Sequence, residues 1–395
     1  MTTIIQTDVT IIGGGIAGLW LLHRLCKAGF SAILLESDAL GSGQTGKSQG
    51  IIHGGMKYAL TGQVTSAAKT ISTMPAIWKA CLEGRGEIDL SNARILAEQQ
   101  ILWSTGTFAS NIASHAATIA LKSETHALDR AHFPALFQNA RFHGKMYSLD
   151  EIVIDVESVL HALATPYRNR IIKIDPITTA DIVSDEKKNT VSLHIRSENK
   201  KATLIAQQCI FTAGGGNALL SELFPPIQMQ RRPLHMVIMK QDYDAPLYGH
   251  CLGLSALPRI TISTHRAHDG KTIWYMGGQL AEEGVSRKKE EQIAATKKEL
   301  KNLFPWFDFS CSSFSSFLID RAEGLQSDGK RPDSCTIQST GNIMAAWPTK
   351  LAFAPLLAER ILQSLTIKPR SLDTTVLQDW PTPSVAKPIW DQLLP

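Results

Sequence analysis

Several signatures that would place this chain in a special class are missing from its sequence. No two of its six cysteines are spaced as Cys-x-x-Cys. This spacing argues against a zinc cluster or a disulfide framework and favours reduced thiols in a large core. The cysteines are Cys26, Cys81, Cys209, Cys251, Cys311 and Cys335. We therefore expect no metal site.

Segments for membrane insertion or export are also missing. The sequence has no run of about eighteen apolar residues. Its first residues do not combine a basic region with an apolar stretch and a cleavage site. We therefore expect a cytoplasmic protein without an integral membrane segment, while peripheral contact with a membrane stays compatible with the sequence.

Charge of one sign is scarce as well. Forty Lys and Arg residues face 36 Asp and Glu residues, which gives a formal net charge of +4, and no long basic run occurs. No nucleic-acid partner is therefore expected. The 395 residues, 44% of them hydrophobic and 19% charged, suffice for two domains or for one elaborated domain of an ordinary globular protein.

The sequence does contain a glycine-rich turn near its start. The apolar pattern of residues 9–12 predicts a buried strand, and residues 16–28 predict a helix. Between them, Gly13, Gly15 and Gly18 have the spacing GxGxxG. Gly13 allows a sharp reversal, Gly15 allows backbone to approach a pyrophosphate, and Gly18 allows close packing of helix on strand.

This helix start is suited to an anion. The N–H groups of the first turn, which includes Ile16 and Ala17, point out of the helix and carry the positive end of its dipole. A second apolar run follows at residues 32–35 and ends in Glu36, about twenty residues after the turn. The Glu36 carboxylate can accept hydrogen bonds from a ribose hydroxyl and would repel a 2′-phosphate, which disfavours NADP.

The context of the turn favours a dinucleotide site over a purely structural glycine turn. A preceding strand, a following helix, a second strand and a terminal acid occur together in this stretch. NAD and FAD both remain open on this evidence from the residues alone. Further along, residues 41–50 form a loop of glycine and small polar residues whose backbone N–H groups could hold phosphate and ring edges. A flexible surface loop is the alternative.

These motifs in this order resemble a known family. The GxGxxG turn, Glu36 and a Thr/Ser/Gly loop that ends in Ile52-His53-Gly54-Gly55 resemble the FAD-dependent oxidoreductases of the D-amino-acid oxidase (DAO) superfamily. The nearest motif match is to glycerol-3-phosphate dehydrogenase and 2-hydroxyglutarate oxidase relatives. The resemblance implies FAD rather than NAD as the cofactor.

The same resemblance implies an α/β fold. A Rossmann-like FAD-binding domain of the three-layer ββα, glutathione-reductase type would be joined to a substrate domain built on a mostly antiparallel sheet plus helices. The expected FAD-binding domain is discontinuous and comprises residues 1–85, 146–222 and 320–395. The expected substrate domain comprises residues 86–145 and 223–319.

Helices are expected at four further places. Their patterns cover residues 66–82, 108–121, 156–164 and 287–304. Asp155 precedes the third of them and is predicted to cap it, because its side chain can accept a hydrogen bond from the first turn.

Two later segments complete the implied cofactor site. Residues 209–216 read as a strand that ends in glycines, for which a core strand with a glycine turn is the alternative. Residues 342–362 read as a strand, a turn and a helix whose N-terminus faces the flavin pyrimidine in relatives. The residues expected to contact FAD are Gly13, Gly15, Ile16, Ala17, Gly18, Glu36, Ser37, Thr45, Gly46, Lys47, Ser48, Gln49, Gly50, Ile51, Ile52, His53, Ile177, Ala213, Gly214, Pro348, Thr349, Lys350 and Leu351.

The resemblance also implies residues that act on the substrate. His235 matches a strand histidine placed to contact the substrate hydroxyl, and it is a candidate general base. Lys350 matches an active-site lysine, and Lys57 and Tyr58 match an Arg-Tyr pair near the substrate. A packed core histidine is the alternative for His235, and a surface lysine at a helix end is the alternative for Lys350.

One motif departs from the family pattern. Members that oxidise amino or hydroxy acids often have a Gly-Leu-Arg-Pro segment whose arginine clamps a carboxylate, and here Gln326 stands in place of that arginine. A neutral amide lacks the charge-assisted fork of arginine. Arg321 offers a replacement charge a few residues away. This departure argues against an ordinary α-amino-acid oxidase.

We therefore expect an FAD-dependent oxidoreductase. It would transfer a hydride to flavin N5 from a C–N or C–OH bond of a small polar substrate, with anionic molecules among the candidates. Oxygen or a quinone would accept the electrons. The alternatives are a glycerol-3-phosphate or hydroxyacid dehydrogenase that feeds a quinone, and a flavin-binding protein without turnover.

Overall fold

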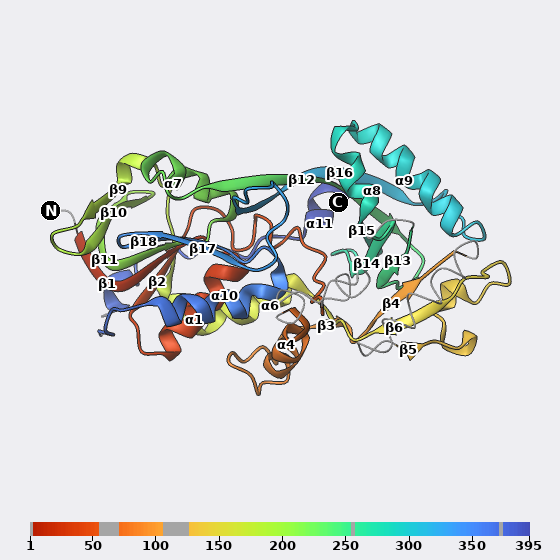
Figure 1. Ribbon diagram of the computed structural model, residues 1–395, viewed down its shortest axis with the longest axis horizontal. Coiled ribbons are helices and arrows are strands. Elements are labelled where there is room, and N and C mark those ends of the chain that lie inside the picture. Colours follow the sequence, from red (N-terminus) through yellow and green to blue (C-terminus); the bar gives the residue numbers. More distant parts are fainter. Residues whose placement is uncertain (1–2, 55–70, 106–125, 254–256, 371–373) are drawn as a thin grey trace.

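The chain forms two large β-sheets that lie side by side along the long axis of the molecule (Figure 1). The computed structural model describes residues 3–54, 71–105, 126–253, 257–370 and 374–395. The first sheet has the strand order β17-β18-β11-β1-β2-β8, and β10 and β9 continue it from β11. Its strands are β1 (Thr3–Ile12), β2 (Ala32–Glu36), β8 (Ile171–Lys173), β9 (Ile182–Asp185), β10 (Thr190–Ser197), β11 (Lys200–Phe211), β17 (Thr336–Thr340) and β18 (Ile343–Trp347).

Strand β1 lies in the middle of the first sheet. It pairs in parallel with β2 on one side and with β11 on the other, and β11 pairs in parallel with β18. Parallel neighbours need a crossover connection, which helix α1 provides between β1 and β2. The predicted strand, turn, helix and second strand are confirmed. The carboxyl ends of β1, β2 and β11 consequently meet at one edge.

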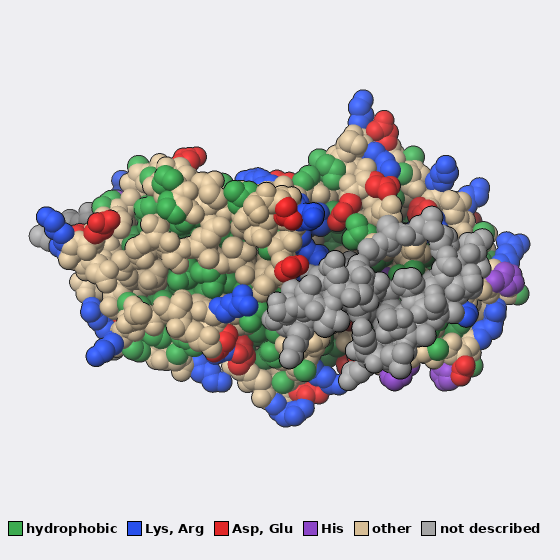
Figure 2. Space-filling model, in the orientation of Figure 1, with side chains coloured by type: hydrophobic (Ala, Val, Ile, Leu, Met, Phe, Trp, Pro, Cys, Tyr) green, Lys and Arg blue, Asp and Glu red, His purple; other side chains and the backbone are tan. Residues whose placement is uncertain are grey.

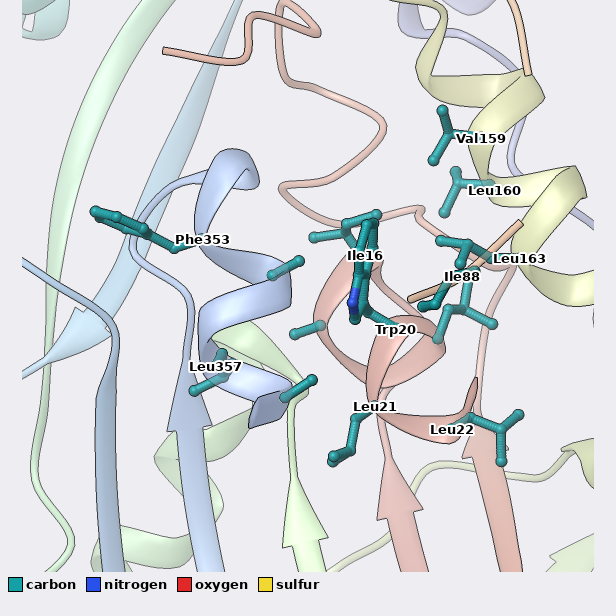
Figure 3. Packing of buried hydrophobic residues seen from close by; sticks show 14 of the residues in the cluster. Ile16, Trp20, Leu21, Leu22, Ile88, Val159, Leu160, Leu163, Phe353 and Leu357 are labelled. Carbon is teal, nitrogen blue, oxygen red and sulfur yellow. The ribbon is translucent and has the colours of Figure 1, made fainter. Parts of the chain in front are cut away.

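Helices cover one face of this sheet. Figure 3 shows Ile16 and Trp20 of α1 between Leu160 and Leu163 of α6 on one side and Leu357 of α10 on the other. All five side chains are buried, so the apolar stripe of α1 is enclosed by its neighbours. The helices of this layer are α1 (Ile16–Lys27), α4 (Met74–Leu82), α6 (Val156–Ala164) and α10 (Ala354–Ser364).

The other face of the first sheet carries a β-hairpin. Strands β9 and β10 pair in antiparallel fashion, and β10 pairs with the first half of β11. Leu193 of β10 belongs to the same buried cluster as Leu35 of β2 and Leu220 of α7 (Ala218–Leu223). Helices, parallel strands and this hairpin therefore form three layers, as the expected ββα arrangement requires.

The second sheet is mostly antiparallel and has the order β16-β12-β15-β14-β13-β4-β6-β5. Because side chains alternate along β12, Met236 joins a cluster with Trp390 of α11, whereas Val237 joins a cluster with Leu300 of α9. The strands are β4 (Gln100–Trp103), β5 (His126–Ala127), β6 (Met146–Leu149), β12 (Met229–Gln241), β13 (Gly249–Cys251), β14 (Ile260–Arg266), β15 (Thr272–Gly277) and β16 (Ser313–Gly324). The helices are α8 (Gln279–Glu283), α9 (Lys289–Leu303) and α11 (Ile389–Leu393).

The two sheets do not divide the chain at the expected boundaries. Strand β6 pairs with β4 in the second sheet, although it falls in the segment 146–222 that we assigned to FAD binding. Strand β16 continues past residue 320 in the second sheet. Helix α11 also packs on the second sheet. Sequence patterning detected the strands but not their partners, so these boundaries differ.

The helix predictions fare better. The predicted helix 156–164 is α6, and its cap is confirmed because Asp155 Oδ1 accepts a hydrogen bond of 3.2 Å from the Glu157 N–H. The predicted helix 287–304 is α9, which spans Lys289–Leu303. The helix predicted for residues 66–82 includes α4, and the one predicted for residues 108–121 lies outside the described residues.

Smaller elements complete the chain. Strands β3 (Ile95–Ala97) and β7 (Val153–Ile154) form a separate pair. No helix among the described residues has the length and apolar character needed to cross a bilayer. On the face seen in Figure 2, Lys and Arg side chains are interspersed with Asp and Glu. The 3-10 helices are η2 (Arg130–His132), η3 (Ala135–Phe137), η4 (Thr165–Arg170), η5 (Thr179–Asp181), η6 (Gly214–Asn217), η7 (Gly284–Ser286), η8 (Leu351–Phe353) and η9 (Thr374–Leu377).

Candidate active site

A cavity of about 960 Å³ extends from the carboxyl-end edge of the first sheet to the second sheet. Gly13, Glu36 and Ala213 line it where β1, β2 and β11 end. Met236 of β12 and Thr261 of β14 line its far end. Ligands of open α/β sheets bind outside the carboxyl ends of the strands, where this cavity lies.

The glycine turn fits tightly against the neighbouring strand. Gly13 has φ of 108°, and a Cβ there would lie 2.7 Å from the backbone of Ala213. A Cβ on Gly18 would lie 2.0 Å from the Gly13 carbonyl oxygen. The turn can therefore form only with glycine at these two positions. A Cβ on Gly15 would instead meet the Thr45 hydroxyl at 3.0 Å, on the cavity side of the turn.

The start of α1 opens into the cavity. The first turn of the helix contains no acidic residue, and Gly15, Ile16 and Ala17 line the cavity wall. The Ile16 N–H donates to the Thr45 hydroxyl at 3.0 Å, which fixes the polar loop against the helix start. This end of α1 therefore presents positive potential to a bound anion.

Glu36 is held at the edge of the same cavity. Its Oε2 accepts a hydrogen bond of 2.6 Å from the Gly14 N–H, and its Oε1 accepts one of 2.8 Å from the Asp38 N–H. These donors position the carboxylate beside the glycine turn. A dinucleotide with its ribose at Glu36 and its pyrophosphate at the start of α1 fits this arrangement.

Most residues predicted to contact the cofactor line this one cavity. Three do not, because Gly18 packs on Gly13, Gly46 packs on the Gly41 carbonyl, and Ile52 is fully buried beside Ile51. Those that line the cavity are Gly13, Gly15, Ile16, Ala17, Glu36, Ser37, Thr45, Lys47, Ser48, Gln49, Gly50, Ile51, His53, Ile177, Ala213, Gly214, Pro348, Thr349, Lys350 and Leu351.

The turn before α10 has an unusual backbone. Thr349 has φ of 63°, in the left-handed region that disfavours β-branched residues, and its hydroxyl donates to the Ser334 carbonyl at 2.9 Å. Lys350 follows with its Nζ 5.5 Å from the centre of the Phe353 ring. Both residues line the cavity, so the predicted lysine is at the wall where we expected it.

His235 lies on the wrong side of the second sheet for the expected substrate contact. Its neighbours in β12, Leu234 and Met236, line the cavity, and His235 points to the opposite face because side chains alternate along a strand. Its Nδ1 lies 2.9 Å from the Gly284 carbonyl oxygen, and its Nε2 lies 2.9 Å from the Ser316 hydroxyl. The structure thus corresponds to the packed histidine that was the alternative.

The other substrate candidates separate in the same way. Gln326 does not line the cavity, and its amide Nε2 donates to the Leu325 carbonyl at 3.1 Å. Arg321 does line it, with Nη1 at 3.2 Å from Oε1 of Glu282. Burial, together with the nearby Arg232, lowers the pKa of Arg321 from its ordinary value. Lys57 and Tyr58 lie outside the described residues.

The structure also brings together three side chains that the sequence did not connect. His53 Nδ1 lies 3.2 Å and His250 Nε2 lies 3.9 Å from Oε2 of Glu151. Both histidines line the cavity. The donor atoms of the three residues all lie within 4.8 Å of one another, although we had expected no such group. No local motif signals the group, because about one hundred positions separate each residue from the next.

Comparison with known proteins agrees with this site. Residues 8–333 match the family model described as FAD dependent oxidoreductase, DAO. The chain is 41% identical over 400 residues to the Probable FAD-dependent oxidoreductase PA4991 of Pseudomonas aeruginosa, and the match covers 99% of both chains. The crystal structure of PA4991 superposes with a TM-score of 0.84 at 36% identity and covers 99% of each chain.

More distant structures share the fold. Glycine oxidase from Geobacillus kaustophilus has a TM-score of 0.67 at 14% identity and covers 94% of this chain and 98% of that one. L-alpha-glycerophosphate oxidase from Mycoplasma pneumoniae, with FAD bound, also has a TM-score of 0.67 at 14% identity and covers 93% and 97%.

The family settles the choice of cofactor that the glycine turn left open. FAD is the cofactor, and the helix start, Glu36 and the Thr349 turn are the parts of this chain that fit its pyrophosphate, ribose and ring. The chain belongs to the DAO family of FAD-dependent oxidoreductases.

Proposed function

We propose that this enzyme oxidises a C–N or C–OH bond of a small polar substrate and passes the electrons to oxygen or to a quinone. Bound FAD supplies the two-electron chemistry by accepting a hydride. The observation that carries the proposal is the continuity of the cavity, which runs from Gly15 at the helix start to His250 and Arg321 in the second sheet. The side chains of this far end need to orient the substrate, exclude water and manage one proton.

The ion pair in the cavity wall favours a substrate with groups of both signs. Arg321 can bind a carboxylate through its guanidinium, and the adjacent Glu282 can bind an ammonium group. Because the pair is neutral as a whole, a zwitterion would replace its internal contact without leaving a charge unpaired. Amino acids and their N-substituted derivatives are therefore the first candidates, with Arg321 in the role that Gln326 lacks.

A hydroxy acid or polyol phosphate is the second candidate. Arg231, Arg331 and Lys350 also line the cavity, and cations of this kind suit a phosphate or carboxylate. A stretch of 81 residues is 35% identical to part of the anaerobic glycerol-3-phosphate dehydrogenase of Escherichia coli (strain K12), which covers 20% of this chain and 15% of the matched polypeptide. This local likeness supports a dehydrogenase that feeds a quinone.

Anaerobic reduction of the flavin tests the proposal. The FAD-loaded enzyme is mixed with amino acids, N-methyl amino acids, hydroxy acids and polyol phosphates, and the visible flavin band is followed. We expect one class to bleach the band. Recovery of the band with air, compared with recovery with a soluble quinone, identifies the acceptor. If no class reduces the flavin, the protein binds flavin without turnover and the proposal is wrong.

Arg321 gives a sharper test of substrate binding. We expect Arg321→Gln to raise KM for the reducing substrate at least about tenfold, because a charge-assisted hydrogen bond contributes roughly 1.5 to 3 kcal/mol. Gln326→Ala is the matched control and should leave KM unchanged, since Gln326 does not line the cavity. The reverse pattern, with KM raised only by the Gln326 change, would restore the family's usual clamp position.

A further inference from the structure

Three ionisable side chains meet at the second-sheet end of the cavity. His53 follows the glycine-rich loop, Glu151 follows β6, and His250 lies in β13. The His53 and His250 rings stack with their centres 6.0 Å apart and their planes at 29°. Residues from both halves of the fold therefore build this cluster, which we call the His-Glu-His cluster.

Glu151 is a buried and fully hydrogen-bonded carboxylate. It is 5% exposed, its Oε1 accepts a bond of 2.8 Å from the Gly54 N–H, and its Oε2 accepts one of 3.2 Å from Nε2 of Gln100. Burial alone would raise the pKa of Glu151, but His53 and His250 outweigh it and hold the pKa well below its usual range. Glu151 is therefore ionised at neutral pH.

The ionised carboxylate sets the protonation of its neighbours. Since Glu151 can only accept, His53 presents an N–H at Nδ1, 3.2 Å away, and carries its basic lone pair at Nε2. The hydroxyl of Thr261 lies 2.8 Å from Nδ1 of His250, so it can donate there and leave the Nε2–H of His250 directed at Glu151. Among the described residues, the titratable groups that act on Glu151 are these two histidines.

A base is required at this end of the cavity. When a C–OH or C–N bond is oxidised, two electrons leave with the hydride to FAD, the proton leaves the O–H or N–H, and a C=O or C=N bond forms. The side chain of His53 is 27% exposed and lines the cavity, whereas His235 faces the other side of the sheet. His53 is therefore better placed than His235 to take the proton.

We propose that Nε2 of His53 accepts the proton released by the substrate and that Glu151 is the positioning residue that fixes the tautomer and orientation of His53. Glu151 also stabilises the imidazolium once it forms, which is the division of roles found in carboxylate-histidine pairs. The inference rests on the proposed oxidation and names the residue that completes it.

An NMR titration of the FAD-loaded protein tests the pair without any substrate. The ring signals of 13C-labelled histidine are followed against pH, and the His53 signal is assigned by its loss in His53→Gln. We expect Glu151→Gln to lower the pKa of His53 by about one unit or more, because it removes the neighbouring charge and keeps the size of the side chain. The control Asp150→Asn removes an exposed carboxylate next door and should leave the His53 signal unchanged. An unchanged His53 titration in Glu151→Gln would overturn the proposal.

Rapid-mixing measurements of anaerobic flavin reduction test the proton transfer itself. With the reducing substrate found above, we expect His53→Gln to slow reduction by about 10² to 10⁴ and to flatten its pH profile, while Asp150→Asn retains the wild-type profile. A His53→Gln profile that runs parallel to the wild type would overturn the assignment. If no compound reduces the wild-type flavin, the proposed function fails together with the proton-acceptor role, whereas the NMR result still reports the coupling of the pair.

Zinc binding is the competing use of the same donors. Calorimetric titration of the wild-type protein with ZnCl2 should give no tight stoichiometric binding, since Gly54 and Gln100 already engage the Glu151 oxygens. Tight binding that disappears in Glu151→Gln would overturn the proposal, because both imidazoles would then be ligands rather than a base and its neighbour.

Discussion

At the scale of single residues, Thr349 combines a strained backbone with a useful contact. Its φ of 63° places a β-branched side chain in the left-handed region, and its hydroxyl donates to the Ser334 carbonyl. Strain of this kind costs on the order of 1 to 3 kcal/mol and persists where the surroundings enforce it. Relatives often have glycine in this segment, which removes the strain. Here the threonine lies at the cavity wall, beside Lys350.

Paired substitutions separate the two contributions of Thr349. Thr349→Ala loses the hydrogen bond and keeps the strain, whereas Thr349→Gly loses both. We therefore expect Thr349→Gly to be more stable than Thr349→Ala by about 1 kcal/mol in denaturant unfolding. The same pair at Thr340, which lies in β17 and has no positive φ, should show the opposite order. The same order at both positions would mean that Thr349 is not strained.

His235 illustrates what a single residue leaves undecided in a sequence. The strand β12 was predicted, but an alternating strand has two faces, and only its pairing with β15 and β16 decides which face meets the cavity. A shift by one residue would exchange the places of His235 and Met236. The packed position of His235 follows from the register, which the local sequence does not contain.

At the scale of elements, the short helix α11 depends on the sheet beneath it. A helix of five residues is not stable alone, so α11 is held by packing, above all by Trp390. The Trp390 ring stacks on His265 of β14 with ring centres 4.4 Å apart. His265 also lies 2.9 Å from the Ser263 hydroxyl through Nε2. The neutral imidazole therefore forms part of the seat of α11.

Acid should weaken this seat. Burial lowers the pKa of His265 to about 4, from 6.5 for an exposed histidine, so the unfolded chain binds the proton first as pH falls. The stability that neutral His265 provides is fully present above pH 6.5 and is lost as pH falls toward 4, by about 3 kcal/mol. We expect His265→Gln to reduce the slope of unfolding free energy against pH across this range.

The control for His265 is a histidine in contact with solvent. His194→Gln on β10 removes an exposed imidazole and should keep the wild-type slope. Equal slopes in wild type, His265→Gln and His194→Gln would show that another group dominates the acid response.

At the scale of the whole molecule, the cofactor cavity joins the two sheets. The loop that lines it is tied to the second sheet, because Nε2 of Gln49 donates to the Tyr275 carbonyl at 2.8 Å and the Tyr275 hydroxyl donates to the Lys47 carbonyl at 2.7 Å. A ligand that fills the cavity contacts both halves. Binding that is restricted to the folded state stabilises that state by mass action.

Removal of FAD should therefore lower the melting temperature. Free FAD at one hundred times its Kd contributes about 2.7 kcal/mol, so adding it to the apoprotein should raise Tm by several degrees. Gly15→Val places a side chain at the helix start inside the cavity and should abolish both the shift and the yellow colour. Ala28→Val adds the same two methyl groups at the exposed far end of α1 and should keep both. An FAD-dependent shift in Gly15→Val would place the pyrophosphate elsewhere.

The sequence by itself determined the cofactor-binding half of this protein. Glycine spacing, an apolar strand and a terminal acid act within about thirty residues, so local geometry alone requires the turn, the helix start and the place of Glu36. The tertiary structure alone decided the substrate end. His53, Glu151 and His250 come from distant parts of the chain and meet only because the two sheets pack around one cavity, and the register of β12 alone turned His235 away from it.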